Sequence, residues 1–223
     1  MTNSLNSTTL TAGSLDPSDP RSLFAHAVVT ARATVHRVRP EQLALPTPCP
    51  DYDVRTLMGH MVVVFRRLAA LGNGTDPMDL PEHVTGIADD QWPAQFLQEA
   101  HDVQAAWSDA AKLDQVMVLP WATAPGAGML AMYTSELTVH TWDLAVATGQ
   151  QPEWHAPTVE AALQTALMAL PPGDREAHFA QMAIDMPQIA GRPPFRNAVE
   201  AGNTASSLDR LIGWYGRQPS SAA

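Results

Sequence analysis

The stretch Ser135-Glu136-Leu137-Thr138-Val139-His140-Thr141-Trp142-Asp143-Leu144 lies within a predicted helix over about 127–147, which closes on a glycine. Residues four apart in a helix stand one turn apart on the same face. Glu136 and His140 have this spacing, and a carboxylate and an imidazole so placed can bind one metal ion. Asp143 shares their face and can accept a hydrogen bond from the His140 ring, as metal-bound histidines usually require. The stretch therefore predicts a helix that supplies two ligands of a metal site.

A third ligand has to come from another part of the chain, and an open coordination position would make such a site catalytic. The best donor is His60, in a predicted helix that starts near Asp53, a good N-cap residue. The residues alone leave a second interpretation open. A Glu-x-x-x-His pair on a helix is usually solvated or satisfied within the protein, and a histidine beside an apolar stripe is more often a core residue than a ligand.

Other candidate residues have weaker support. Cys49 is flanked by prolines, with no histidine or basic residue beside it, and we do not expect it to be a nucleophile. The remaining histidines lack acidic partners at helical spacing or lie in loops and near breaks, so we expect them to be structural or solvated. They are His26, His36, His83, His101, His155 and His178.

Composition limits the class of protein. The chain has 223 residues, of which 45% are hydrophobic, which indicates a globular domain with a sizeable core. The formal net charge of −10 argues against binding nucleic-acid phosphates or an anionic membrane surface. A single cysteine excludes an intrachain disulfide and suits a reducing cytosol, and the longest apolar run, 61–65, is too short to span a bilayer. We expect a soluble cytoplasmic protein with no nucleic-acid or membrane partner.

Apolar periodicity predicts helices joined by loops and hence an all-α, antiparallel bundle. We expect a long loop over 73–90, a short strand over 116–121 and a turn over 123–128, while prolines and glycines break up 187–204. The expected helices cover about 20–38, 53–72, 93–113, 127–147, 157–170, 174–186 and 206–215.

The expected domain organisation is simple. Residues 1–19 are rich in Thr, Ser, Asn, Asp and Pro and are expected to form a disordered N-terminal segment. Residues 20–217 are expected to form a single helical-bundle domain, and residues 218–223 a disordered tail. We find no internal repeat, no targeting segment, no Gly-rich phosphate loop and no Gly-x-Ser-x-Gly motif.

Two segments resemble a known family. The segment 46–60, Pro-Thr-Pro-Cys-Pro-Asp-Tyr-Asp-Val-Arg-Thr-Leu-Met-Gly-His, is similar to the Thr-Pro-Cys-x-x-Trp-x-Val-x-x-Leu-x-x-His opening of actinobacterial DinB-like proteins. The segment 136–149 is similar to their Glu-x-x-x-His-x-Trp-Asp-Leu-Ala-x-Ala-Thr-Gly core, and 207–212 resembles their tail. This group is the mycothiol-dependent maleylpyruvate isomerase N-terminal family of the DinB/YfiT superfamily, and the likeness spans roughly residues 20–217.

The resemblance implies a DinB-like antiparallel four-helix bundle, here with a short C-terminal extension. It implies a divalent metal, usually zinc, held by His60, Glu136 and His140, the residues that spacing also selects. It further implies thiol-dependent chemistry, in which a low-molecular-weight thiol such as mycothiol attacks a small electrophilic substrate. Bundles of this kind often pair through a helix face, which allows a homodimer.

Two departures from the family pattern lead us not to expect the isomerase activity itself. The isomerase has a second, sterol-carrier-like domain that supplies part of its active site, and the residues after the bundle are too few for it. The family's typical Trp is Tyr52 here. The leading hypothesis is a metal-dependent enzyme resembling a mycothiol S-transferase. The alternatives are a non-catalytic helical module that binds a small ligand or a protein, and a metal hydrolase that uses bound water.

Overall fold

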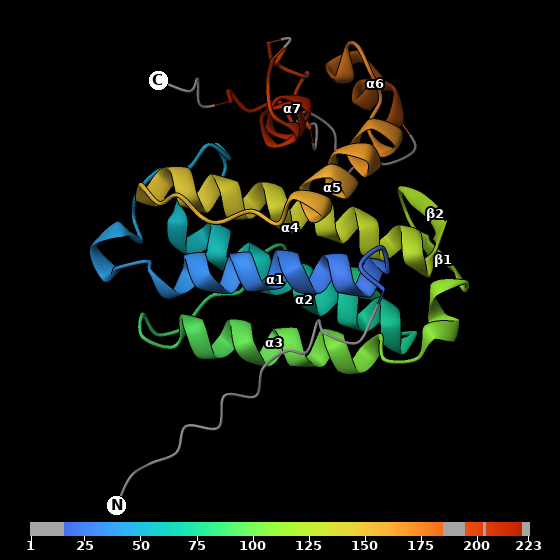
Figure 1. Cartoon of the computed structure of the whole chain (residues 1–223), viewed down its shortest axis with the longest axis horizontal. Helices are drawn as coiled ribbons and strands as arrows, with labels where there is room; N and C mark the ends of the chain where they lie inside the picture. Colours follow the sequence, from blue (N-terminus) through green and yellow to red (C-terminus); the bar gives the residue numbers. More distant parts are fainter. Residues whose placement is uncertain (1–15, 185–194, 203, 220–223) are drawn as a thin grey trace, which may run out of the picture.

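A computed structural model describes residues 16–184, 195–202 and 204–219 (Figure 1). Most of these residues are helical, and a small two-stranded sheet accompanies the helices. None of the described helices combines the length and apolarity needed to cross a membrane. The α-helices are α1 (Pro20–His36), α2 (Val54–Asn73), α3 (Trp92–Ala106), α4 (Gly126–Thr148), α5 (Ala156–Ala169), α6 (Arg175–Met182) and α7 (Ser207–Trp214). The strands are β1 (Val116–Leu119) and β2 (Ala122–Pro125), and the short 3-10 turns are η2 (Pro40–Gln42), η3 (Pro77–Asp79) and η4 (Ala110–Leu113).

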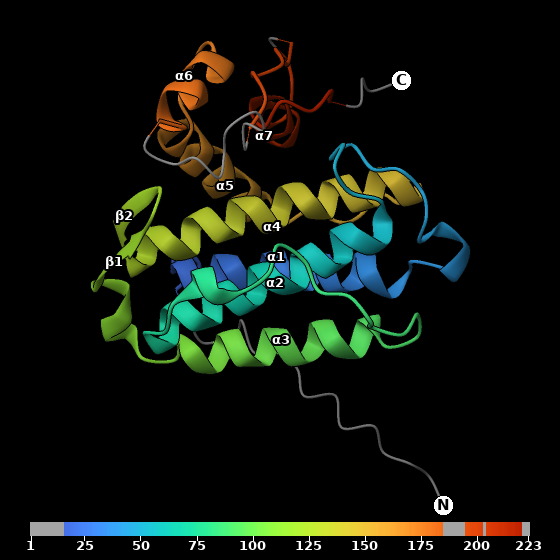
Figure 2. The same ribbon diagram turned by 180° about the vertical axis from the view of Figure 1, so that it is seen from behind.

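The four long N-terminal helices pack in a closed cycle of neighbours. Helix α1 contacts α3 and α4, and α2 contacts the same two helices. Both views show α1 to α4 running side by side, with α3 and α4 on opposite sides of the α1–α2 pair (Figures 1 and 2). Their facing side chains form the larger apolar core of the protein, which includes Phe24, Leu57, Phe65, Phe96 and Leu137. Burial of this apolar surface is the main stabilising term for the arrangement.

Helix α2 has the boundaries that its sequence predicts. The Asp53 side chain caps the N-terminus by accepting a hydrogen bond from the backbone N–H of Thr56 at 2.8 Å. The helix ends at Gly74, which has a φ of +69° and therefore adopts the left-handed conformation that favours glycine. Between these ends, His60 occupies a buried position among apolar neighbours.

Helix α4 is buried along most of its length because other elements cover it on both sides. One side faces α1 and α2, and the other faces α5. Buried threonines would leave unsatisfied hydroxyls, but Thr134, Thr138 and Thr141 each donate to the carbonyl four residues earlier at 2.7 Å. The helix therefore carries polar side chains through the interior without orphaned hydroxyls at these positions.

The C-terminal residues form a packed layer on α4, which is more than the short extension expected from the sequence. Helices α5, α6 and α7 lie on the side of α4 that faces away from α3 (Figure 1). Apolar side chains of α5 and α7 join Val139 and Trp142 of α4 in a second core. The Ser135 hydroxyl of α4, which has no exposed surface, lies 3.0 Å from the Tyr215 hydroxyl and donates to the Ala162 carbonyl. This layer, called the C-terminal layer below, comprises the described residues from 156 to 217.

Two local predictions were wrong. The predicted helix over 93–113 ends at Ala106, because Asp109 accepts from the Ala111 N–H and starts the separate turn η4. The predicted turn over 123–128 is instead strand β2 followed directly by α4. Strand β2 pairs antiparallel with β1, with Val116 opposite Pro125. The strand expected over 116–121 therefore pairs with residues whose composition had predicted a turn.

The predicted domain ends are described only in part. Within the expected N-terminal segment, residues 16–19 form a turn in which the Asp19 side chain caps α1, and 1–15 lie outside the described residues. Residues 220–223 of the expected tail also lie outside them, as do residues 187–194 and 203 of the broken segment 187–204.

The loop between α2 and α3 crosses α2 at a glycine. The Val84 N–H donates to the Gly59 carbonyl at 3.2 Å, and the Val84 carbonyl oxygen lies against the Gly59 Cα. A Cβ at position 59 would overlap that oxygen. The absence of a side chain lets the loop lie on the helix, and it brings Glu82 beside His60.

We predict that Gly59→Ala lowers the free energy of unfolding by about 1–3 kcal/mol, because the new methyl group forces the loop away from α2. Urea unfolding followed by circular dichroism measures this change. Gly128→Ala is the matched control in α4, where the new Cβ comes within 3.2 Å of the Ala124 Cβ and otherwise makes ordinary contact with the Pro125 ring. It should change stability by less than about 1 kcal/mol, since alanine also favours the helix. Equal effects of the two substitutions would contradict the close crossing.

Candidate metal centre

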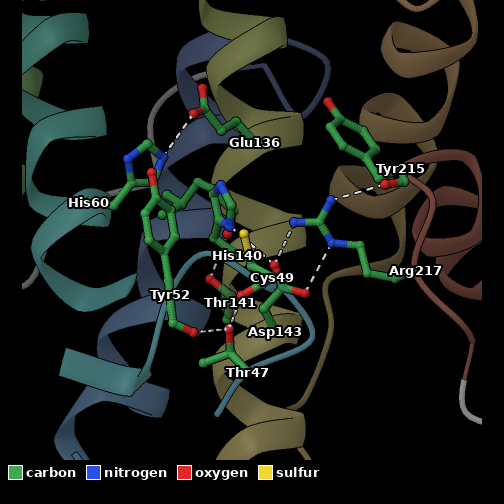
Figure 3. Close-up of polar contacts among 11 residues, drawn as sticks. Thr47, Cys49, Tyr52, His60, Glu136, His140, Thr141, Asp143, Tyr215 and Arg217 are labelled. Carbon is green, nitrogen blue, oxygen red and sulfur yellow. Dashed lines mark hydrogen bonds and ion pairs between the residues drawn. The ribbon is translucent and has the colours of Figure 1, made fainter. Parts of the chain in front are cut away.

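Helices α2 and α4 bring together the three side chains selected from the sequence. His60 Nε2 lies 3.3 Å from Glu136 Oε1 (Figure 3). The centroids of the His60 and His140 rings are 5.0 Å apart, and the ring planes make an angle of 82°. One potential ligand atom of each residue lies within 4.8 Å of the other two. The side chains of both histidines are about one-tenth exposed, and that of Glu136 is 34% exposed, so solvent reaches the group beside the carboxylate.

A main-chain oxygen orients His60. Its Nδ1 lies 2.9 Å from the carbonyl oxygen of Glu82, and a carbonyl only accepts hydrogen bonds, so Nδ1 carries a proton. The lone pair of Nε2 then faces the Glu136 carboxylate, which is also an acceptor. Two acceptors at this distance need a proton or a cation between them. The donor set therefore fits a metal ion.

A buried carboxylate orients His140. Asp143 Oδ2 lies 3.1 Å from His140 Nδ1, and Asp143 has no exposed surface. Because Asp143 is also paired with Arg217, it is a carboxylate, and Nδ1 is the donor of the hydrogen bond. Nε2 is left as the ring nitrogen available to a metal ion.

Arg217 is the site residue that sequence reasoning missed. Its Nε and Nη2 lie 3.1 and 2.9 Å from the two Asp143 oxygens, which is a bidentate ion pair (Figure 3). Arg217 follows the last helix and is 74 residues from Asp143 in the chain. No spacing rule connects residues so far apart, so only the packing of the C-terminal layer reveals the pair.

The electrostatics favour the protonation states needed for metal binding at two of the three candidate ligands. Burial raises the pKa of Glu136, but hydrogen bonding and charge from His60 outweigh it, and the pKa lies below its usual value. Burial lowers the pKa of His140 despite the Asp143 hydrogen bond. Burial also opposes the charge on His60, but the Glu136 contact raises its pKa. A metal ion would thus meet a carboxylate and a neutral imidazole, and would displace a proton from His60.

Cys49 lies closer to the site than the sequence indicates. Its sulfur and one potential ligand atom each of His140 and Asp143 lie within 4.8 Å of one another. This second group is less suited to a cation, because Asp143 is already neutralised by Arg217. Burial raises the pKa of the Cys49 thiol, with partial opposition from the Arg217 charge. A raised pKa keeps more of the thiol in its protonated, less nucleophilic form.

His26 and His155, which the sequence analysis expected to be structural or solvated, contact each other away from the candidate metal centre. The His26 and His155 rings stack at 3.7 Å where α1 meets the start of α5, and His155 Nδ1 lies 2.9 Å from the Thr158 hydroxyl. They lie outside the groups of potential metal ligands among the described residues. Their contact is consistent with a structural role at this junction.

Comparisons with known proteins bear on the same region. A family model described as the mycothiol maleylpyruvate isomerase N-terminal domain matches residues 24–145, more than half of the chain. Two proteins of Mycobacterium tuberculosis, uncharacterized protein MT0763 of strain CDC 1551 / Oshkosh and uncharacterized protein Rv0738 of strain ATCC 25618 / H37Rv, are each 28% identical over 132 residues. The match covers 59% of this chain and 69% of each relative. No solved structure matches significantly.

We predict that native Cys49 reacts slowly with iodoacetamide at pH 8. Its raised pKa reduces the thiolate fraction, and partial burial limits access, so the rate should be at least about tenfold below that of the same chain unfolded in urea. Mass spectrometry gives both rates, and the single cysteine makes the label unambiguous. A native rate equal to the unfolded rate would contradict the position of this thiol.

Proposed function

Because the chain belongs to the mycothiol maleylpyruvate isomerase N-terminal domain family, we propose that it is a divalent-metal-dependent enzyme that uses a low-molecular-weight thiol. In this proposal His60, Glu136 and His140 hold the metal, with zinc the expected ion, and Asp143 orients His140. Mycothiol is the expected thiol, and the second substrate is a small electrophile. The observation that carries the proposal is that potential ligand atoms of three side chains from two helices lie within 4.8 Å of one another, beside solvent.

The geometry supports a catalytic rather than a structural site. Three protein ligands leave a coordination position open, whereas structural zinc sites usually have four protein ligands. A divalent ion held there lowers the pKa of a bound thiol and favours the thiolate, which is the reactive form. The protein's part is to present Nε2 of each histidine, to keep Glu136 ionised and to enclose the site between α2 and α4.

The expected DinB-like antiparallel four-helix bundle belongs to the same proposal. The cycle of contacts among α1, α4, α2 and α3 supports it, since such a cycle encloses one core. We also propose that the described residues from 20 to 217 form one domain. The second core, which joins α4 to α5 and α7, supports this boundary.

We predict that protein purified without a His-tag contains about one divalent ion per chain. His60→Ala should lower metal affinity by at least about 100-fold, because two ligands and water replace three protein ligands. Elemental analysis and competition with a chromogenic chelator measure both quantities. His36→Ala is the control, since His36 is exposed at the end of α1. Equally little metal in the wild type and in His60→Ala would refute the metal site and favour a non-catalytic helical module.

We predict a direct interaction between the thiol and the metal. Adding mycothiol to cobalt-substituted protein should produce a sulfur-to-cobalt charge-transfer band, because the open position accepts a thiolate. S-methyl mycothiol, which cannot form a thiolate, is the matched control. Absence of a band with mycothiol would remove the thiol from the proposal. Turnover of ester or amide substrates without thiol would then favour the hydrolase.

A further inference from the structure

The C-terminal layer reaches the candidate metal centre through one side chain. Arg217 lies outside residues 24–145, which the family model matches, yet it pairs with Asp143 inside them. The Arg217 side chain is 13% exposed and that of Asp143 is completely buried, so water screens the pair very little. Asp143 Oδ2 serves both Arg217 Nη2 and His140 Nδ1.

A glycine turn directs Arg217 toward α4. Gly216 has a φ of +77°, a conformation that L-residues with a side chain rarely adopt, and Arg217 N–H donates to the Ile212 carbonyl at 3.1 Å. A Cβ on Gly216 would also lie 2.9 Å from the Asn197 carbonyl oxygen. Arg217 Nη1 donates to the Tyr215 carbonyl at 3.0 Å, which holds the guanidinium in one orientation (Figure 3).

The pair connects this turn to a proposed metal ligand. Asp143 can hold the proton of His140 on Nδ1 only while it is an ordered carboxylate. Arg217 satisfies both carboxylate oxygens and fixes the plane of the group. Loss of Arg217 would leave a completely buried carboxylate with His140 as its remaining side-chain hydrogen-bond partner among the described residues. Such a carboxylate moves, takes up water or becomes protonated.

We propose that Arg217 is a positioning residue, which acts through Asp143 to hold His140 with Nε2 directed at the metal centre. Its relevance to catalysis rests on the proposed function, but its effect on the His140 ring does not. The C-terminal layer is then part of the site, even though it contributes no ligand.

The opposing possibility is that the ion pair only fastens the C-terminal layer to α4. That layer already has other attachments, including the Ser135–Tyr215 contact and the second apolar core. A fastening role predicts lower stability without a specific change at His140. The experiment therefore has to separate stability from the state of one imidazole ring.

The test compares Arg217→Gln and Arg217→Lys with Arg210→Gln. Arg210 is exposed on α7, so its substitution removes the same charge from the same layer away from Asp143. Nitrogen-15 NMR of the metal-free proteins reports the His140 tautomer, and chelator competition reports zinc affinity. We expect the wild type and Arg210→Gln to show the Nδ1–H tautomer with equal affinity. Arg217→Gln should show mixed tautomers and an affinity lower by about 10–100-fold, with Arg217→Lys between them.

An unpaired buried charge can prevent folding, so the double variant Asp143→Asn/Arg217→Gln is made in parallel. Removing both partners avoids the unpaired charge, and this variant should fold with mixed His140 tautomers and weak zinc binding. Unchanged Nδ1–H tautomer and zinc affinity in folded Arg217→Gln, or in the double variant, would overturn the positioning role. A wild type that binds no zinc would instead overturn the proposed function, while the tautomer comparison would still decide the role of Arg217.

Discussion

The buried charge of Asp143 constrains how helix α4 and the C-terminal layer pack together. A carboxylate without exposed surface is stable only if both oxygens are satisfied, and here His140 and Arg217 satisfy them. This requirement connects two parts of the fold, because the partners come from α4 itself and from the turn after α7. Helix α4, the His140 ring and the turn that carries Arg217 must therefore adopt compatible positions.

Helix α4 meets this requirement because it is enclosed on both sides. A helix at the surface would have one polar face, but α4 packs on α1 and α2 on one side and on α5 on the other. The hydroxyls of Thr134, Thr138 and Thr141 donate within the helix, whereas Glu136 and Asp143 reach His60 and Arg217 in other elements.

Local signals in the sequence were sufficient for much of this architecture. Asp53 predicted the start of α2, and the spacing of Glu136, His140 and Asp143 placed them on one face of α4, because both inferences depend on neighbouring residues. Strand β2 was missed because its own residues, Ala-Thr-Ala-Pro, have little strand preference, and the two-residue connection 120–121 lacks the Asn-Gly or Asp-Gly signal of a hairpin. Arg217 was missed for a related reason: its partner is set by how the C-terminal layer docks, which no short window of sequence contains.

The orientations of His60 and His140 depend in different ways on the amino-acid sequence around them. A main-chain carbonyl holds His60, and every residue type at position 82 supplies that carbonyl. Point mutations at position 82 leave the acceptor in place, whereas an insertion or deletion in the loop between the end of α2 and Val84 would displace it. His140 depends on the chemical identity of two side chains far apart in the chain. Homologous chains should therefore vary in residue type at position 82 while keeping Gly59 and the loop length, and should change the second pair only together.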